Sequence, residues 1–183
     1  MGFYLKKINA AAAFLVILSL LGHAGTMTFS LWTGWYNFMI AKTFAYVTAG
    51  ALALHVLISL IIFFFFHDGA SLKYKKENKT VIIQRATALL ILILLHVHIT
   101  AYSHMATGET LTVVQTIFYC ISESLFFISV ASHAAVSVSK GMITLGLISS
   151  PKTVRAVDII SYSLCAFIML AATGGMLSFF IGG

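Results

Sequence analysis

Long apolar runs alternate with short polar stretches along the whole chain. Five of these runs reach the length of about 20 residues that a bilayer-crossing helix needs. They lie at about 8–30, 43–66, 81–102, 112–139 and 156–181. The first run is also typical of a secretory signal, but we expect it to be retained because four more spans follow. The pattern predicts an all-α membrane protein with five transmembrane helices in one domain, residues 1–183.

Composition favours the same fold class. Of the 183 residues, 60% are hydrophobic and only 9% are charged, which is far from the balance of a soluble domain. No segment between the spans is long enough to fold as a domain. We therefore expect any chemistry on soluble substrates to take place on a partner subunit.

The formal net charge of +6 indicates topology rather than binding to nucleic acid. Every Lys and Arg except Lys42 lies near the chain start, between the second and third spans or at the start of the third, or between the fourth and fifth. Loops rich in Lys and Arg stay in the cytoplasm. The distribution predicts a multi-pass protein of the cell (inner, cytoplasmic) membrane, with its N-terminus in the cytoplasm and its C-terminus outside.

Histidines inside the spans are the main candidates for function. Of seven histidines, five lie within apolar runs: His23, His55, His96, His98 and His133. An ionisable side chain within a membrane is costly and marks a functional-site hypothesis. An interhelical hydrogen bond explains any single one equally well, but four successive spans each carry at least one.

Two of these histidines are expected in the outer half of the membrane. At a rise of about 1.5 Å per residue, His23 lies roughly 24 Å outward from Lys7. His98 lies roughly 20 Å outward from Arg85 by the same rise. The two histidines therefore form a natural pair.

The other two are expected in the inner half. His133 is about 10 Å from Lys140 at the cytoplasmic boundary. His55 is ambiguous, because it is about 18 Å from the inside counted from His67 and about 20 Å from the outside counted from Lys42. If the second helix overhangs the cytoplasmic side of a hydrocarbon layer about 30 Å thick, His55 is level with His133.

Paired imidazoles in an apolar helix bundle favour haem. Neutral nitrogen ligands can fill both axial positions of a haem iron, and this leaves no open position and favours electron transfer. Zinc is less favoured, because two histidines supply too few protein ligands. Two haems at different depths would form an electron path across the membrane.

The third span carries the most specific motif. In the segment "IQRATALLILILLHVHIT", a Gln-Arg-x-Thr start at Gln84 is followed by His98 fourteen residues later. This resembles the third core helix of the cytochrome b membrane subunit of succinate dehydrogenases and fumarate reductases, in the type in which one polypeptide carries two b haems. The spacing selects His98 over His96, which lies about 200° around the helix from His98.

Other spans share the resemblance. The segment "SHAAVSVSKGMITLGLISSPKTVR" is similar to the family's fourth helix, and "FYLKKINAAAAFLVILSLLGH" is similar to its first. His55, 29 residues before Gln84, matches the second-helix ligand. The matching positions of the fourth segment are His133, Lys140, Gly146, Leu147, Pro151 and Lys152.

The resemblance implies a complete electron path. His23 and His98 would be the axial iron ligands of an outer haem b, and His55 and His133 those of an inner haem b. Menaquinone or a related quinone would react near the outer haem. A flavoprotein with covalently bound flavin and an iron-sulfur subunit would bind on the cytoplasmic face, so that this chain is the quinone-reactive part of an oxidoreductase complex.

Basic residues near the cytoplasmic face have two interpretations. Arg85 and Lys140 are candidates for contacts with haem propionates. The loops "LKYKKENK" and "KTVR" are candidates for the same contacts or for docking the partner subunits. Binding of anionic membrane lipid explains the loops equally well.

Glu123 is the only carboxylate deep inside a span, because Asp158 lies at the start of the fifth. It lies about 15 Å outward from His133, at the depth of the outer haem. One interpretation is that it passes a proton to or from quinone. The other is a protonated carboxyl bonded to a neighbouring helix.

A quinone pocket is expected at the outer surface. Its candidate lining residues are Trp32, Trp35, Tyr36, Asn37, Tyr102 and His104. Trp and Tyr are also ordinary anchors at membrane interfaces, so these positions have a structural interpretation as well.

Three alternatives compete with the family function. A dihaem cytochrome b of another quinone-linked dehydrogenase or a hydrogenase shares the four-ligand logic. A small proton-coupled transporter would use the histidines and Glu123 as a haem-free proton relay. A structural anchor would bind neither haem nor quinone.

Overall fold

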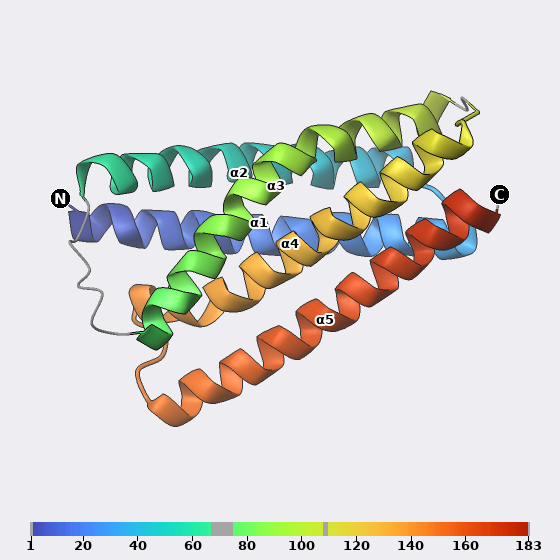
Figure 1. Cartoon of the computed structure of the whole chain (residues 1–183). Helices are drawn as coiled ribbons and strands as arrows, with labels where there is room; N and C mark the ends of the chain where they lie inside the picture. Colours follow the sequence, from blue (N-terminus) through green and yellow to red (C-terminus); the bar gives the residue numbers. More distant parts are fainter. Residues whose placement is uncertain (1, 67–74, 108–109, 183) are drawn as a thin grey trace.

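Five long helices make up the computed structural model, which describes residues 2–66, 75–107 and 110–182. His67 and Lys73 lie outside the described residues, together with the sequence interpretations that rest on them. The helices are α1 (Gly2–Thr33), α2 (Phe38–Phe65), α3 (Lys75–Thr107), α4 (Val113–Leu145) and α5 (Pro151–Gly182). The two termini lie at opposite ends of the helical assembly (Figure 1), as an odd number of crossings requires.

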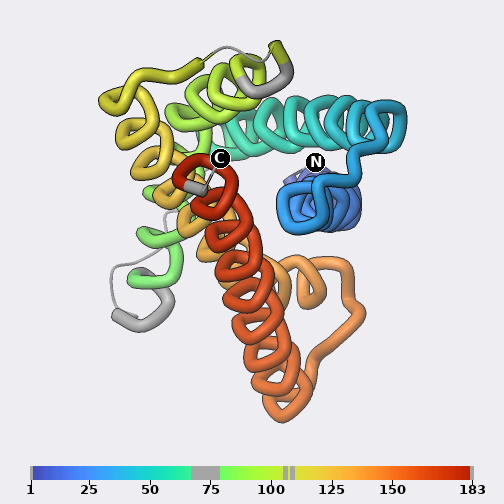
Figure 2. Tube along the Cα trace, turned by 90° about the vertical axis from the view of Figure 1, so that its right-hand side faces the viewer, coloured from blue at the N-terminus to red at the C-terminus, as the bar shows by residue number. Residues whose placement is uncertain are grey.

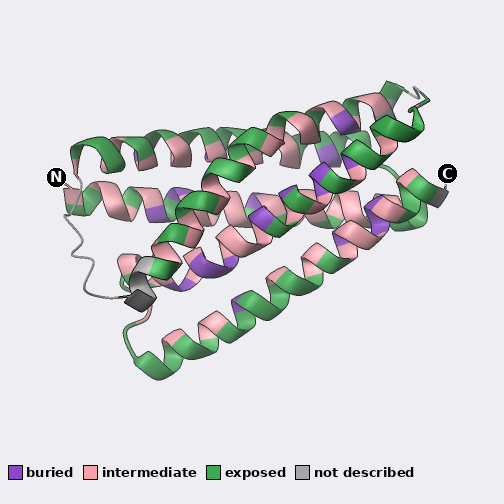
Figure 3. Ribbon diagram, viewed as in Figure 1, coloured by how far each residue is buried: buried purple, intermediate pink, exposed green. Residues whose placement is uncertain are grey.

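All five helices are long and apolar enough to cross a membrane. Large apolar side chains cover their outer faces, among them Leu18, Leu57, Ile93 and Phe167, each of which is exposed. Figure 3 shows buried positions mainly where helices face one another, with exposed positions over the outside. Apolar surface on this scale needs lipid around it. The prediction of an all-helical, multi-pass membrane protein is confirmed.

The helices extend past the apolar runs that predicted them. We expected the third helix to begin near residue 81 and the fourth to end near 139, but α3 begins at Lys75 and α4 continues to Leu145. An apolar run measures the hydrocarbon thickness, whereas backbone hydrogen bonding carries a helix on into the polar interface. For the same reason, Lys42 lies inside α2.

The break between α4 and α5 is built from two residues. Gly146 ends α4 with φ 79°, a left-handed conformation that glycine adopts without strain. Pro151 is the first residue of α5 rather than part of the loop before it. Proline suits that position because its missing N–H has no partner there in any helix.

The helices pack in a connected series. The closest neighbours are α1 with α2, α3 with α4, and α4 with α5, and α1 also contacts α4 and α5. Figure 2 shows α1 and α2 side by side, and α3, α4 and α5 run obliquely to them (Figure 1). The backbones of α2 and α3 make no close approach within the described ranges.

Small side chains let the helices approach each other. The buried residues include Ala10, Ala41, Ala101, Ser129 and Ala135. Interfaces between membrane helices favour such residues because lipid tails compete with large apolar ones. Several hydroxyls, such as that of Ser129, donate to a carbonyl oxygen four residues earlier in their own helix. This satisfies them where no water is present.

Candidate functional site

His23 of α1 and His98 of α3 lie next to each other. Their ring centroids are 6.4 Å apart and the ring planes are inclined by 81°. Both side chains are partly buried. The structure thus brings together the two residues that the depth argument paired, although the backbones of α1 and α3 do not come into close contact in the described chain.

Glu123 of α4 contacts the His98 member of this pair. Its Oε2 lies 2.8 Å from His98 Nδ1, and the residue is completely buried, with 0% of its surface exposed. Its other oxygen, Oε1, has no hydrogen-bond partner among the described residues. Two aromatic rings also contact His98, which stacks on Phe126 at 4.6 Å and 23° and lies 4.9 Å from Tyr102.

His133 of α4 is fixed by α3. Its Nδ1 lies 3.0 Å from the backbone oxygen of Gln84 and 3.2 Å from the hydroxyl oxygen of Thr87. His55 belongs to α2, and its Nδ1 lies 3.4 Å from the backbone oxygen of Asn9 in α1. The backbones of α2 and α4 make no close approach in the described ranges, and the pairing of His55 with His133 stays a prediction.

His96 points away from both pairs. It is exposed on α3, whereas His98 is partly buried. In the described chain, the backbone carbonyl oxygen of His96 accepts a hydrogen bond from Thr100 Oγ1. The geometry therefore separates the two histidines as the helical angle predicted.

The donor set fits haem iron. A bond from a metal to an imidazole nitrogen is about 2 Å long, so two imidazoles on opposite sides of one ion have ring centroids roughly 6 Å apart. The 6.4 Å between His23 and His98 agrees with that spacing. Nowhere in the described part of the chain do three His, Cys, Asp or Glu side chains gather in a metal-binding group. A porphyrin brings its own four nitrogen ligands and needs only two from the protein.

Two cationic side chains lie near the His133 level. Lys140 Nζ is 3.4 Å from Gln84 Oε1, and Gln84 Nε2 donates to Ser137 Oγ at 2.9 Å. The Arg85 guanidinium lies over the Phe63 ring of α2, 5.2 Å from its centroid. These are the two residues that we expected near haem propionates. The Arg85 contact brings side chains of α2 and α3 together where their backbones stay apart.

The expected quinone residues do not form a single cluster. Asn37 caps α2, because its side-chain oxygen accepts a hydrogen bond from the backbone N–H of Ile40 at 3.1 Å. Trp35 packs edge-on against Phe29 at 5.9 Å, and His104 lies 6.1 Å from the Tyr119 ring. Tyr36 is exposed. Their proposed contact with quinone stays a prediction.

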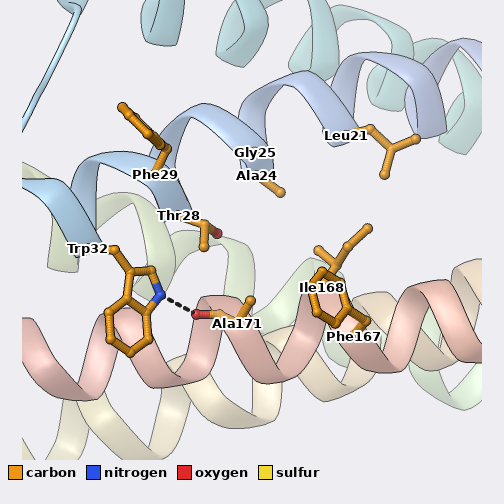
Figure 4. Close-up of a pocket in the computed structure, with 9 residues that line it drawn as sticks. All are labelled: Leu21, Ala24, Gly25, Thr28, Phe29, Trp32, Phe167, Ile168 and Ala171. Carbon is orange, nitrogen blue, oxygen red and sulfur yellow. Dashed lines mark hydrogen bonds between the residues drawn. The ribbon is translucent and has the colours of Figure 1, made fainter.

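Trp32 lines an apolar groove between α1 and α5. Its indole N–H donates to the backbone oxygen of Ala171 at 3.1 Å (Figure 4). The groove has a volume of about 360 Å³. Its lining residues are Leu21, Ala24, Gly25, Thr28, Phe29, Trp32, Phe167, Ile168 and Ala171. Figure 4 shows the side chains from the two helices facing each other across it.

Sequence reasoning missed two residues that hold the histidines. Thr87 was noted only as part of a motif, and Asn9 was not singled out. Besides its contact with His55, Asn9 donates from Nδ2 to Ser59 Oγ of α2 at 3.1 Å. For Thr87 the available signal was a polar residue inside a span, where it needs a partner. Asn9 contacts His55 through its backbone oxygen, which no residue type signals.

The sequence matches no protein-family model, no curated protein and no solved structure. The resemblance to the cytochrome b subunit of succinate dehydrogenases and fumarate reductases therefore rests on the residues of the four spans alone. The function that follows from it is a proposal.

Proposed function

We propose that this chain is the membrane anchor and cytochrome b subunit of a succinate:quinone oxidoreductase, either a succinate dehydrogenase or a fumarate reductase. The observation that carries the proposal is the adjacency of two intramembrane histidines from different helices, since His23 of α1 lies beside His98 of α3. His55 and His133 are the second pair that the depth argument predicts. The Gln-Arg-x-Thr motif and its spacing to His98 support this family over other dihaem cytochromes.

Each histidine pair would hold one haem b within a core bundle formed by α1 to α4. When bound, the haems supply stepwise one-electron transfer between the two faces of the membrane. The chain's own task is to orient the imidazoles. His133 is oriented by Gln84 and Thr87, and His98 by Glu123. The surrounding apolar side chains keep water and other ligands away from the site.

The two ends of the path need partners. In the proposed orientation, with the N-terminus in the cytoplasm, a flavoprotein and an iron-sulfur subunit dock on the cytoplasmic face, near the end of the bundle that carries His55 and His133. Arg85 and Lys140 lie at that level and can neutralise haem propionates. The dicarboxylate chemistry takes place on the flavoprotein.

Menaquinone or a related quinone would react near His23 and His98. The groove between α1 and α5 supports this placement, because Ala24 and Gly25 line it and directly follow His23. Its lining is mainly apolar, which suits an isoprenoid quinone. Trp35, Tyr36, Asn37 and His104 remain the proposed contacts at the outer surface. Glu123 remains a proposed proton carrier for the same reaction.

A haem-free proton-coupled transporter is the second candidate. The observation that favours it is the fully buried carboxyl of Glu123, which forms a hydrogen bond with His98. The His23 ring lies beside that of His98. Such a chain of ionisable groups can relay protons within a membrane. It requires no porphyrin, so haem content separates the two candidates.

A reduced-minus-oxidised optical spectrum of the purified chain, with haem quantified per polypeptide, tests the proposal. We expect two b-type haems in the wild type and one in either His98→Ala or His133→Ala. His96→Ala is the matched control, because it removes an imidazole from the same helix two residues away, and it should keep both haems. A wild-type chain without haem would refute the proposal, and loss of both haems from one substitution would refute the pairing.

A further inference from the structure

The four paired histidines differ in what their Nδ1 atoms contact. His133 and His55 face backbone oxygens, those of Gln84 at 3.0 Å and Asn9 at 3.4 Å. His23 Nδ1 is buried without a hydrogen-bond partner among the described residues. His98 Nδ1 alone meets a carboxylate oxygen, Glu123 Oε2, at 2.8 Å.

Glu123 has no second hydrogen-bond partner among the described residues. It is completely buried, and Oε1 makes no hydrogen bond in the described parts of the chain. A buried polar contact of this kind adds little stability, because the cost of desolvation offsets the attraction between the groups. A role in holding the fold together is therefore a weak explanation, whereas a role toward His98 accounts for the single short contact.

A hydrogen bond at Nδ1 decides which imidazole nitrogen can bind a metal. If Nδ1 carries the proton and donates it to a carboxylate, Nε2 keeps its lone pair free. Such an outer partner fixes the tautomer and ring orientation of a ligating histidine and increases its basicity. A more basic ligand stabilises the ferric over the ferrous ion and thereby lowers the midpoint potential.

We propose that Glu123 is the positioning residue of His98: it accepts the Nδ1 proton, leaves Nε2 as the ligating atom, and makes His98 the most electron-donating of the four axial ligands. This inference rests on the proposed function. Aromatic side chains also constrain the His98 ring, since Phe126 stacks on it and Tyr102 packs against it. Glu123 therefore controls proton placement and charge at a ring whose plane is already constrained.

Potentiometric titration of the purified chain, monitored optically, tests the proposal through Glu123→Gln. This substitution keeps the shape and a hydrogen-bond acceptor but removes the negative charge. We expect the midpoint potential of the His23/His98 haem to rise and that of the other haem to stay unchanged, with two haems still bound. The His98→Ala chain, which keeps only the other haem, assigns the two waves. Glu123→Asp, which restores the charge, should return the potential toward the wild-type value.

Asp158→Asn is the matched control, because it makes the same carboxylate-to-amide change in α5. It should alter neither potential. If Glu123→Gln leaves both potentials unchanged while two haems are bound, Glu123 is a packing residue and only this inference falls. If the wild type contains no haem, both the inference and the proposed function fall.

A second measurement needs no substitution and covers the case in which the Gln variant does not fold. In the reduced, diamagnetic state of wild-type chain labelled with 15N-histidine, we expect one Nδ1–H proton resonance to lie well downfield of the others. That shift is the signature of a strong hydrogen bond to a carboxylate. Four similar Nδ1–H resonances would overturn the inference.

Discussion

His133 Nδ1 lies 3.0 Å from the backbone oxygen of Gln84, one helix away. The side chain of the same glutamine contacts Ser137 and Lys140, both of which follow His133 on α4. Gln84 therefore fixes the position of α4 relative to α3 with its backbone and its side chain together. This connection sets the height at which His133 faces the centre of the bundle.

Thr87→Val should shift the midpoint potential of the His55/His133 haem and leave the other haem unchanged. The substitution removes the hydroxyl oxygen that lies 3.2 Å from His133 Nδ1 and preserves the shape of the side chain. We expect a smaller effect than that of Glu123→Gln, because the hydroxyl is neutral and the Gln84 carbonyl remains. Optical potentiometry measures the shift.

Thr100→Val on the same helix is the control, since in the described contacts that hydroxyl bonds only to its own helix, at the carbonyl oxygen of His96. An equal shift of both haems would contradict the assignment.

Gln84→Leu should destabilise the contact between α3 and α4. It removes the side-chain hydrogen bond to Ser137 and the contact with Lys140. Hydrogen bonds between membrane helices contribute about 0.6 kcal/mol on average, so we expect a loss of roughly 1 kcal/mol. Reversible unfolding in mixed detergent micelles measures the free energy.

Ser137→Ala supplies the second arm of a double-mutant cycle with Gln84→Leu. Because both substitutions remove the same hydrogen bond, the double variant should be less destabilised than the sum of the two single variants. Strict additivity would show that the 2.9 Å contact between Gln84 Nε2 and Ser137 Oγ contributes nothing to stability.

Gly22→Ala should weaken the packing of α1 on α2. A Cβ at Gly22 would overlap the Phe44 ring, and overpacking of this kind costs typically about 1–3 kcal/mol. Thermal unfolding of the purified chain measures the loss. Gly25→Ala, one turn along α1, is the control, because a Cβ there meets nothing within 4 Å. Combining Gly22→Ala with Phe44→Ala should restore part of the stability lost, and failure to do so would place the strain elsewhere.

Asn37→Ala should destabilise the start of α2. Loss of a helix-capping side chain costs typically about 1 kcal/mol, and Asn37 caps α2 through Ile40. Asn37→Asp keeps an oxygen acceptor and adds a negative charge that the helix N-terminus favours, so it should retain the stability of the wild type. Thermal unfolding distinguishes the two. If Asn37→Asp is stable but slows quinone turnover, Asn37 has a role in quinone binding in addition to the cap.

The sequence was informative wherever a local rule applied. The length of each apolar run predicted five helices, because backbone groups within lipid must bond inside their own helix. Counting residues at a fixed rise put His23 and His98 in the same half of the membrane, and the helical angle separated His96 from His98. The helix ends were less predictable, since nothing in an apolar run marks where hydrogen bonding stops, as the extension of α4 past Lys140 illustrates.

What the sequence determined by itself is the set of quantities that accumulate along one helix: the number of spans, the distance of each histidine along its span and the helix face on which it lies. What only the tertiary structure decided is which side chain of another helix meets each of those histidines. Glu123 and His98 are 25 residues apart, and Asn9 and His55 are 46 apart. Their contacts depend on the rotation and tilt of whole helices, which are set by the sum of many small packing energies over an interface rather than by any local pattern.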